Sequence, residues 1–274
     1  MEAKRNLIPR GIPAVIFLIF MAAIGRLPAA ADQEDIVIGK KISVDSEILE
    51  ESRVLLISLP ADYDTSTDRY PVLYLLDGDW HFHHVSGILR FFAWARKPIP
   101  MIVVAIPNTH RGRDFSPAVW PGYDSYTGGA DRFIRFMQEE LIPAIDRKYR
   151  TQSYRVLCGH SLAGTFALYA FLSSPELCDA TISLSPCLFW HDGFMLKKTE
   201  EFLGKHKALN KILFIAHEYA DRAPLSTMEE FTGALTGRAP KGLRWTSLYK
   251  ENEDHFSYVH KAIYDGLEYV FKNK

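Results

Sequence analysis

Short apolar runs alternate along the chain with amphipathic stretches. Residues 70–78 ("YPVLYLLDG") and 101–108 ("MIVVAIPN") are apolar runs that end in turn signals, which is typical of strands buried on both faces. Further strands are predicted over 35–46, 52–60, 154–159, 180–186, 211–217 and 243–249. The first two of these follow one another and alternate partly in polarity, so we expect them to form a hairpin.

Helical periodicity marks the stretches between the strands. Phe133, Met137 and Leu141 recur every four residues and give a helix over 130–150 one apolar face. Further helices are predicted over 83–97, 162–174, 194–206, 225–235 and 258–271, and a long loop over 110–129. Strands that alternate with helices imply right-handed crossovers. The pattern therefore predicts one α/β domain with a mainly parallel central sheet of about eight strands flanked by helices.

The N-terminus has a different pattern. Lys4, Arg5 and Arg10 precede an apolar run over 11–25, which is about 15 residues long and is shorter than the ~20 residues that span a bilayer. Small residues follow, with Ala29 and Ala31 in A-x-A relation. This order predicts a secretory signal peptide over 1–31 and a mature domain over 32–274. The alternative is an uncleaved anchor. We expect the mature protein to be secreted or periplasmic, without a stable membrane span.

Composition excludes two classes of protein. Hydrophobic residues make up 47% and charged residues 24%, the balance of a globular chain rather than a disordered one. The formal net charge is −1, so no basic field favours nucleic acid as a partner. The three cysteines are Cys158, Cys178 and Cys187, too few for a disulfide framework and without metal-ligand spacing. Whether Cys178 and Cys187 form a disulfide stays open.

The segment Gly159–Gly164 ("GHSLAG"), called the elbow below, lies between a predicted strand and a predicted helix. It differs from the nucleophile motif G-x-S-x-G only in having Ala163 at the second glycine position. A serine on this sharp turn presses the residues two positions away against each other, so both must be small. Gly159 and Ala163 meet that requirement. Ser161 is therefore the candidate nucleophile, and the alternative is a strand-to-helix turn that contains a serine by chance.

A histidine and an acid follow the serine in the order that this fold uses. His255 lies in a polar segment after the last predicted strand, whereas its rival His260 falls within the last helix. Two carboxylates follow the penultimate strand, Glu218 at its end and Asp221 in the next turn. We favour Asp221 as the acid that orients His255, with Glu218 as the alternative. Either carboxylate can also be a plain turn residue, and some serine hydrolases use a Ser–His pair.

An oxyanion hole needs two backbone N–H groups. The residue after the serine, Leu162, supplies one of them. The second is expected from the turn after residues 70–76, where Gly78 permits a close backbone approach and Asp79 follows. Asp77 precedes the serine in the chain and is expected to shape this turn rather than to act as the catalytic acid.

Aromatic and cationic side chains near the predicted strand ends are candidates for substrate contact. Trp80, Trp120 and Trp190 can line a pocket for an acyl or aryl group, and packing is an equally good explanation for each. Arg113 and its neighbour Arg111 can meet an anionic substrate. A structural pair between Arg113 and Asp114, or another loop carboxylate, is the alternative.

Three histidines in "DWHFHH" invite comparison with a metal site. His81, His83 and His84 lie at a predicted turn and helix start, without a second cluster of ligands to complete a coordination sphere. We therefore expect no metal there.

These segments together resemble the Putative esterase family of α/β-hydrolases, which includes esterase D, enterobactin-type siderophore esterases, feruloyl esterases and mycolyltransferases. The resemblance runs over roughly 53–271 and rests on five blocks in order: "YPVLYLLDGDWHFHH", "IPMIVVAIPNTHRGRDFSP", "FMQEELIPAIDRKYRT", "YRVLCGHSLAGTFALY" and "ISLSPCLFW". It is strongest to the siderophore-esterase-like branch. The chain departs from the family at Ala163 and at Cys187, where serine is frequent.

The resemblance implies an α/β-hydrolase fold, no cofactor, acyl-ester chemistry, Ser161 as nucleophile and His255 as base. The leading hypothesis is an exported serine esterase that acts on a small-molecule ester. An acyltransferase that uses the same acyl-enzyme, and a non-catalytic binding protein of the same fold, are the alternatives. Siderophores, aryl esters, acyl sugars and thioesters all remain open as substrates for a pocket lined by Trp80, Arg113 and Trp190.

Overall fold

The computed structural model describes residues 34–95, 100–120, 127–189, 193–218 and 225–272. The chain divides into two units, Met1–Val37 and Ile38–Lys274. The fold described here is that of the second unit. The signal peptide predicted over 1–31 lies outside the described residues and stays a prediction.

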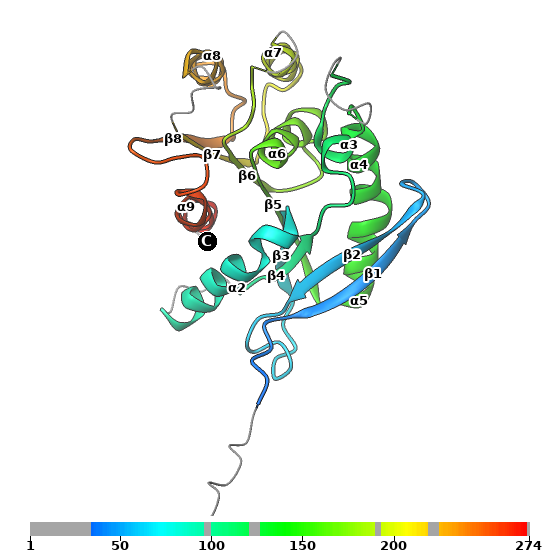
Figure 1. The fold of residues 1–274 in the computed structure, drawn as a ribbon. Helices are drawn as coiled ribbons and strands as arrows, with labels where there is room; N and C mark the ends of the chain where they lie inside the picture. Colours follow the sequence, from blue (N-terminus) through cyan, green and yellow to red (C-terminus); the bar gives the residue numbers. More distant parts are fainter. Residues whose placement is uncertain (1–33, 96–99, 121–126, 190–192, 219–224, 273–274) are drawn as a thin grey trace, which may run out of the picture. The chain divides into compact units, whose positions relative to one another are not determined.

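A sheet of eight strands forms the centre of this unit (Figure 1). The strands are β1 (Lys40–Ser46), β2 (Glu51–Ser58), β3 (Tyr70–Leu76), β4 (Ile102–Ile106), β5 (Thr151–His160), β6 (Ala180–Leu184), β7 (Ile212–Glu218) and β8 (Arg244–Lys250). Their order is β1-β2-β4-β3-β5-β6-β7-β8. The pairs β1–β2 and β2–β4 are antiparallel and all the others are parallel. The predicted strand order along the chain, the hairpin and the mainly parallel sheet are confirmed.

Helices cover both faces of the sheet. They are α2 (Gly78–Trp94), α3 (Arg111–Phe115), α4 (Ala130–Phe136), the π-helical turn η1 (Met137–Leu141), α5 (Ile142–Lys148), α6 (Leu162–Ser173), α7 (Phe194–Lys205), α8 (Leu225–Leu235) and α9 (Val259–Phe271). Figure 1 shows α2 and α9 on one side of the sheet and α6 with its neighbours on the other.

The central strands are apolar throughout because both of their faces are covered. In β3, Tyr74 and Leu76 belong to the core under α4 and α6, whereas Leu73 and Leu75 belong to the core under α2 and α9. Alternate side chains of a strand point to opposite faces, so a doubly covered strand needs apolar residues at every position. This requirement explains why the apolar runs located the strands.

The helices differ most from the prediction at the start of α2 and in the segment 110–129. The helix expected from residue 83 begins at Gly78, because Asp77 adopts a left-handed conformation (φ 51°) and turns the chain directly from β3 into α2. A Cβ on Gly78 would lie 2.7 Å from the backbone nitrogen of Ile106, so the "DG" pair allows a tight helix start rather than a loop. The loop expected over 110–129 contains the short helix α3.

A buried ion-pair cluster connects β2 to α3. Arg53 is 1% exposed, and its Nη1 lies 2.8 Å from both Glu51 and Asp114. Arg113 contacts the same two carboxylates at 2.7 Å each. The structural pairing considered for Arg113 is therefore what the structure shows. The cluster anchors the segment after β4 to the antiparallel edge of the sheet.

We expect Asp114→Ala to lower the free energy of unfolding strongly, because it leaves buried Arg53 with one carboxylate. The loss should approach the about 3 kcal/mol typical of breaking a buried ion pair, since Glu51 still contacts the guanidinium. Urea unfolding followed by circular dichroism measures it. Arg135→Ala, which removes the exposed pair with Glu139, is the control and should leave the unfolding midpoint nearly unchanged. Equal midpoints for the two variants would contradict the role of the cluster.

Candidate active site

Ser161 occupies a strained turn between β5 and α6. Its backbone has φ 59° and ψ −123°, a combination that side-chain-bearing residues rarely adopt. The Ser161 N–H donates to the carbonyl of Leu184 at the end of β6, at 2.8 Å. The Ser161 carbonyl accepts a hydrogen bond from the Thr165 N–H, also at 2.8 Å. The elbow has the local geometry that exposes a nucleophilic serine at the end of a strand.

The glycines of the elbow stand where the backbone passes other backbone. A Cβ on Gly159 would lie 2.3 Å from the carbonyl oxygen of Ala163, and a Cβ on Gly164 would lie 2.2 Å from that of Leu184. Both distances are far below any real contact, so neither position accepts a side chain. Ala163 is itself fully buried and fits. Position 163 thus requires a small residue, and the second glycine is needed at 164, where α6 crosses β6.

His255 and Glu218 meet in the structure. Nδ1 of His255, in the loop after β8, lies 2.7 Å from Oε1 of Glu218, the last residue of β7. The Glu218 side chain is 2% exposed. Burial raises its pKa, but hydrogen bonds from His255 and Ser185 outweigh burial and lower the pKa to about 2. Glu218 is therefore an ionised carboxylate that fixes the imidazole with Nδ1 as donor.

Two hydroxyl groups lie behind this carboxylate. The Ser185 hydroxyl contacts Oε2 of Glu218 and the hydroxyl of Tyr258, whose own O–H lies 3.3 Å from the carbonyl of Ala216. Ser185 has a positive φ of 44°, and its N–H donates to Ala216 at 2.8 Å. Sequence reasoning missed both residues. The only signal was a serine followed by proline at a strand end, which does not reveal what the hydroxyl contacts.

Asp221, the favoured acid, and Trp190, a candidate pocket residue, lie outside the described residues. The alternative acid, Glu218, is the one for which the structure shows a contact with His255.

The turn expected to complete the oxyanion hole follows β3. Asp77 is fully buried, and its carboxylate accepts hydrogen bonds from Nε and Nη2 of Arg111 at 2.8 and 2.9 Å. Asn108 adds a further hydrogen bond to Asp77 at 2.7 Å. Nη2 of Arg111 also lies 3.3 Å from the carbonyl oxygen of His160, in the elbow. Asp77 therefore shapes this turn, as expected, and Arg111 connects the turn to the elbow.

The remaining candidates of this turn lie at the surface. The Asp79 carboxylate accepts hydrogen bonds from the backbone and side-chain nitrogens of Asn108 at 3.3 and 3.1 Å. Trp80 is 57% exposed, and the guanidinium of Arg111 lies 5.1 Å from the centre of one of its rings. The Arg113 guanidinium is instead held in the buried cluster described above.

Cys187 lies beside the nucleophile. Its backbone N–H donates to Oγ1 of Thr165 at 2.7 Å, and that hydroxyl donates to the carbonyl oxygen of Ser161 at 3.1 Å. Burial raises the pKa of the thiol. The structure has no disulfide between Cys178 and Cys187, and all three cysteines are free thiols.

The histidines of "DWHFHH" contact each other rather than converge on one point. Nδ1 of His81 lies 2.9 Å from Nε2 of His84, whereas His83 is exposed on α2. Burial lowers the pKa of both inner histidines, that of His84 to about 4. Within the part of the chain that the structure describes, no group of three or more histidine, cysteine, aspartate or glutamate side chains is arranged to hold a metal ion.

None of the helices described is long and apolar enough to cross a bilayer.

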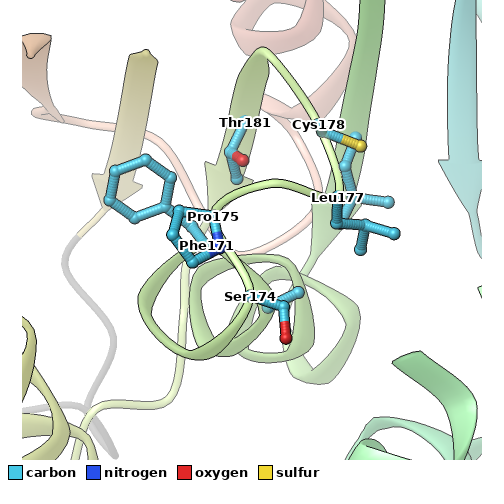
Figure 2. A pocket seen from close by; sticks show the side chains of 8 residues that line it. Phe171, Ser174, Pro175, Leu177, Cys178 and Thr181 are labelled. Atoms are coloured by element: carbon cyan, nitrogen blue, oxygen red, sulfur yellow. The ribbon is translucent and has the colours of Figure 1, made fainter. Parts of the chain in front are cut away.

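A separate hollow lies at the other end of α6 (Figure 2). Phe171, Ser174 and Pro175 line it together with Cys178 and Thr181. The length of α6 places it about 18 Å from Ser161 at 1.5 Å per residue. It is therefore no part of the site around the elbow.

Comparison with known proteins agrees with this geometry. The model of the family described as Putative esterase matches residues 46–232, more than half of the chain. The ferri-bacillibactin esterase BesA of Bacillus subtilis is 33% identical over 234 residues, 73% of this chain and 78% of that protein. The siderophore enterobactin esterase of Emericella nidulans is 34% identical over 162 residues, but these are only 51% of this chain and 54% of that protein.

A solved structure has the same architecture. The IroE-like serine hydrolase of Shewanella oneidensis superposes with a TM-score of 0.81 at 33% identity, over 85% of this chain and 80% of that one. The α/β-hydrolase fold expected from the sequence is thereby confirmed. The chain belongs to the Putative esterase family and is an esterase of the serine-hydrolase type.

Proposed function

We propose that the protein cleaves esters through an acyl-enzyme on Ser161, with His255 as base and Glu218 as the acid that orients it. The contact of 2.7 Å between His255 and Glu218 carries this proposal. The ring centre of His255 lies 4.6 Å from that of His160, the neighbour of Ser161, and this distance places His255 next to the elbow. A strained serine, a histidine beside it and a buried carboxylate behind the histidine form the arrangement that nucleophilic catalysis requires.

The reaction follows from these positions. As Oγ of Ser161 bonds to the ester carbonyl carbon, Nε2 of His255 takes the hydroxyl proton, and Glu218 stabilises the imidazolium through Nδ1–H. The carbonyl oxygen becomes an oxyanion. The N–H of Leu162 and that of Gly78 or Asp79 stabilise it, because N–H groups in the first turn of α6 and α2 have no acceptor within their helices. His255 returns the proton to the leaving alcohol, and water then releases the acid by the same steps.

The substrate class proposed is the ester bond of a siderophore. The relatives support it, since two of them are named as esterases of ferri-bacillibactin and enterobactin. The exposed Trp80 and the adjacent guanidinium of Arg111 give the site an aromatic and cationic border that suits a planar or anionic ligand. We further propose that the protein is exported by the signal peptide over 1–31 and acts as a secreted or periplasmic enzyme.

Ser161→Ala should abolish labelling by a fluorophosphonate probe and lower kcat/KM by a factor on the order of 10⁴ or more, because it removes the atom that is acylated. Hydrolysis of p-nitrophenyl acetate measures the loss, and a panel of catecholate lactone, aryl, acyl-sugar and thioester substrates tests the proposed class. Ser153→Ala, on the exposed part of the same strand, is the control. Labelling of Ser161→Ala at the parental rate would refute the mechanism. Preference for another panel member would refute the substrate class.

Glu218→Gln should lower kcat by about 10³–10⁴-fold, since the imidazolium loses its counter-charge and the correct tautomer of His255 is no longer enforced. Asp221→Asn, the matched change at the other candidate acid, should leave kcat near that of the parent. The reverse result would assign the acid to Asp221. Steady-state kinetics of the two variants decide between them.

The contact between His255 and Glu218 predicts that the stability of the protein depends on pH. The pKa of Glu218 is lowered from its ordinary value of 4.5 to about 2 in the folded protein. A lowered pKa contributes stability that is fully present above about pH 4.5 and is lost as the pH falls toward about 2. The difference in unfolding free energy between the parent and Glu218→Gln should therefore shrink over this window. A difference that grows on acidification would contradict the assignment.

Export predicts processing of the chain. When the full chain is expressed in a bacterium with a Sec system, the mature protein should begin near Asp32, which N-terminal sequencing measures. Replacement of Ala29 and Ala31 by bulky residues should block cleavage, because the peptidase requires small side chains there. A mature protein that still begins at Met1 would contradict export by this route.

A further inference from the structure

Arg111, the first residue of α3, bridges the two turns that carry the proposed oxyanion donors. Its Nε and Nη2 donate to the two carboxylate oxygens of Asp77 at 2.8 and 2.9 Å. Its Nη2 also lies 3.3 Å from the carbonyl oxygen of His160. The guanidinium lies 5.1 Å from the centre of a ring of Trp80, so its position is defined from a further side. One side chain thus hydrogen-bonds the end of β3 and the end of β5.

Both of the groups that Arg111 bonds lie just before a proposed donor in the chain. Asp77 directly precedes Gly78, the first residue of α2. His160 lies two positions before Leu162, the first residue of α6. Because β3 and β5 are paired in the sheet, the starts of these two helices are neighbours. The separation of the two N–H donors therefore depends on how the turn after β3 lies against the elbow.

The Asp77 carboxylate is directed away from the helix that it precedes. Aspartate is a preferred N-cap residue because its side chain accepts a hydrogen bond from an N–H of the first turn. Asp77 occupies the N-cap of α2 but makes no such bond. Its oxygens accept instead from Arg111 and from Nδ2 of Asn108, the latter at 2.7 Å. The first-turn N–H groups are thus left open to an oxyanion by the capping side chain.

The same guanidinium offsets a charge that would oppose the reaction. The Asp77 side chain is fully buried and stands one residue from a proposed donor, whereas the oxyanion is a second negative charge. Like charges close together in a poorly solvated site repel strongly. An arginine that bonds both carboxylate oxygens supplies the opposite charge and also fixes the plane of the carboxylate.

We propose that Arg111 is a positioning residue of the oxyanion hole. Its hydrogen bonds to Asp77 and to the His160 carbonyl hold the N–H donors of α2 and α6 at the separation that an oxyanion needs. Arg111 acts through these two groups and does not itself touch the reacting atoms. The inference rests on the proposed function, in which both helix starts serve the acyl-enzyme on Ser161.

Loss of the guanidinium should lower turnover and leave substrate binding nearly unchanged. Removal of a whole oxyanion donor costs about 10²–10³-fold in kcat. Arg111→Met displaces a donor rather than removing it, so we expect kcat to fall by about 10–100-fold with KM within about threefold. The loss should be equal for neutral p-nitrophenyl acetate and anionic p-nitrophenyl hemisuccinate. A rise in KM for the anionic ester alone would assign Arg111 to substrate contact and overturn the inference.

Phenylboronic acid tests the oxyanion hole without turnover. Oγ of Ser161 donates an electron pair to boron while the hydroxyl proton passes to His255, and the tetrahedral boronate formed is an anion like the reaction intermediate. Because such an analogue binds through the contacts of the transition state, its Ki should rise in Arg111→Met by about the same factor as kcat falls. A parental Ki would contradict the positioning role.

Two further variants separate positioning from stabilisation of the fold. Arg111→Lys keeps the charge but not the planar fork, and its kcat should stay at least about fivefold below the parent. The double variant Arg111→Met/Asp77→Asn removes both charges, so its unfolding midpoint should recover relative to Arg111→Met. Positioning predicts that its kcat stays at least about fivefold low. Recovery of kcat to within fivefold in either variant would make the pair purely structural and overturn the inference.

Controls keep this inference separate from the function on which it rests. Arg238→Met removes an exposed arginine that pairs with Glu200 and should leave kcat and the boronate Ki unchanged. Ser161→Ala is measured in the same assays. If Ser161→Ala keeps parental activity, the proposed function fails. If Ser161→Ala is inactive while Arg111→Met keeps the parental kcat and Ki, the function stands and the positioning role of Arg111 is refuted.

Discussion

The close approach of the elbow to β6 is the constraint on which the site depends. Ser161 keeps its positive φ because its N–H reaches the carbonyl of Leu184 and because Gly159 and Gly164 let backbone pass against backbone. Strain of this kind persists only where the surroundings determine the conformation completely. Here the surroundings are two central strands and a helix that is buried along nearly its whole length. A deeply buried part of the fold therefore carries a strained backbone conformation.

Because β5 to β8 run parallel, their ends bring the remaining residues of the site to the same edge of the sheet. Ser161 follows β5, Ser185 follows β6, Glu218 ends β7, and His255 lies in the loop after β8. These strands are neighbours in the sheet and run in the same direction, so residues nearly 100 positions apart become adjacent. Arg111 extends the arrangement to β3 by bonding both Asp77 and the His160 carbonyl. Each group is thus fixed by a strand end rather than by loop conformation alone.

The sequence predicted the parts of this arrangement that depend on local pattern. Apolar runs located the central strands because strands covered on both faces admit few polar residues, and partial alternation of polarity located β1 and β2. The small residues Gly159 and Ala163 identified the elbow although Ala163 replaces the second glycine of the motif. Contacts between distant elements were not predictable in the same way. Whether Glu218 or Asp221 faces His255 depends on a difference of three positions at the end of β7. The Ser185–Tyr258 pair and the Asp77–Arg111 pair arise only once the strands are in order.

Burial also determines which side chains of the site are charged. Glu218 is ionised and buried, with His255 and two hydroxyl groups around it, whereas burial keeps His160 neutral next to the base. When His255 accepts the serine proton, its new positive charge therefore meets a negative partner on one side and an uncharged ring on the other. A cationic histidine at position 160 would oppose that charge at close range, since like charges near each other in a poorly solvated site repel strongly. The residue before the nucleophile can thus contact the base closely only because the fold keeps it out of water.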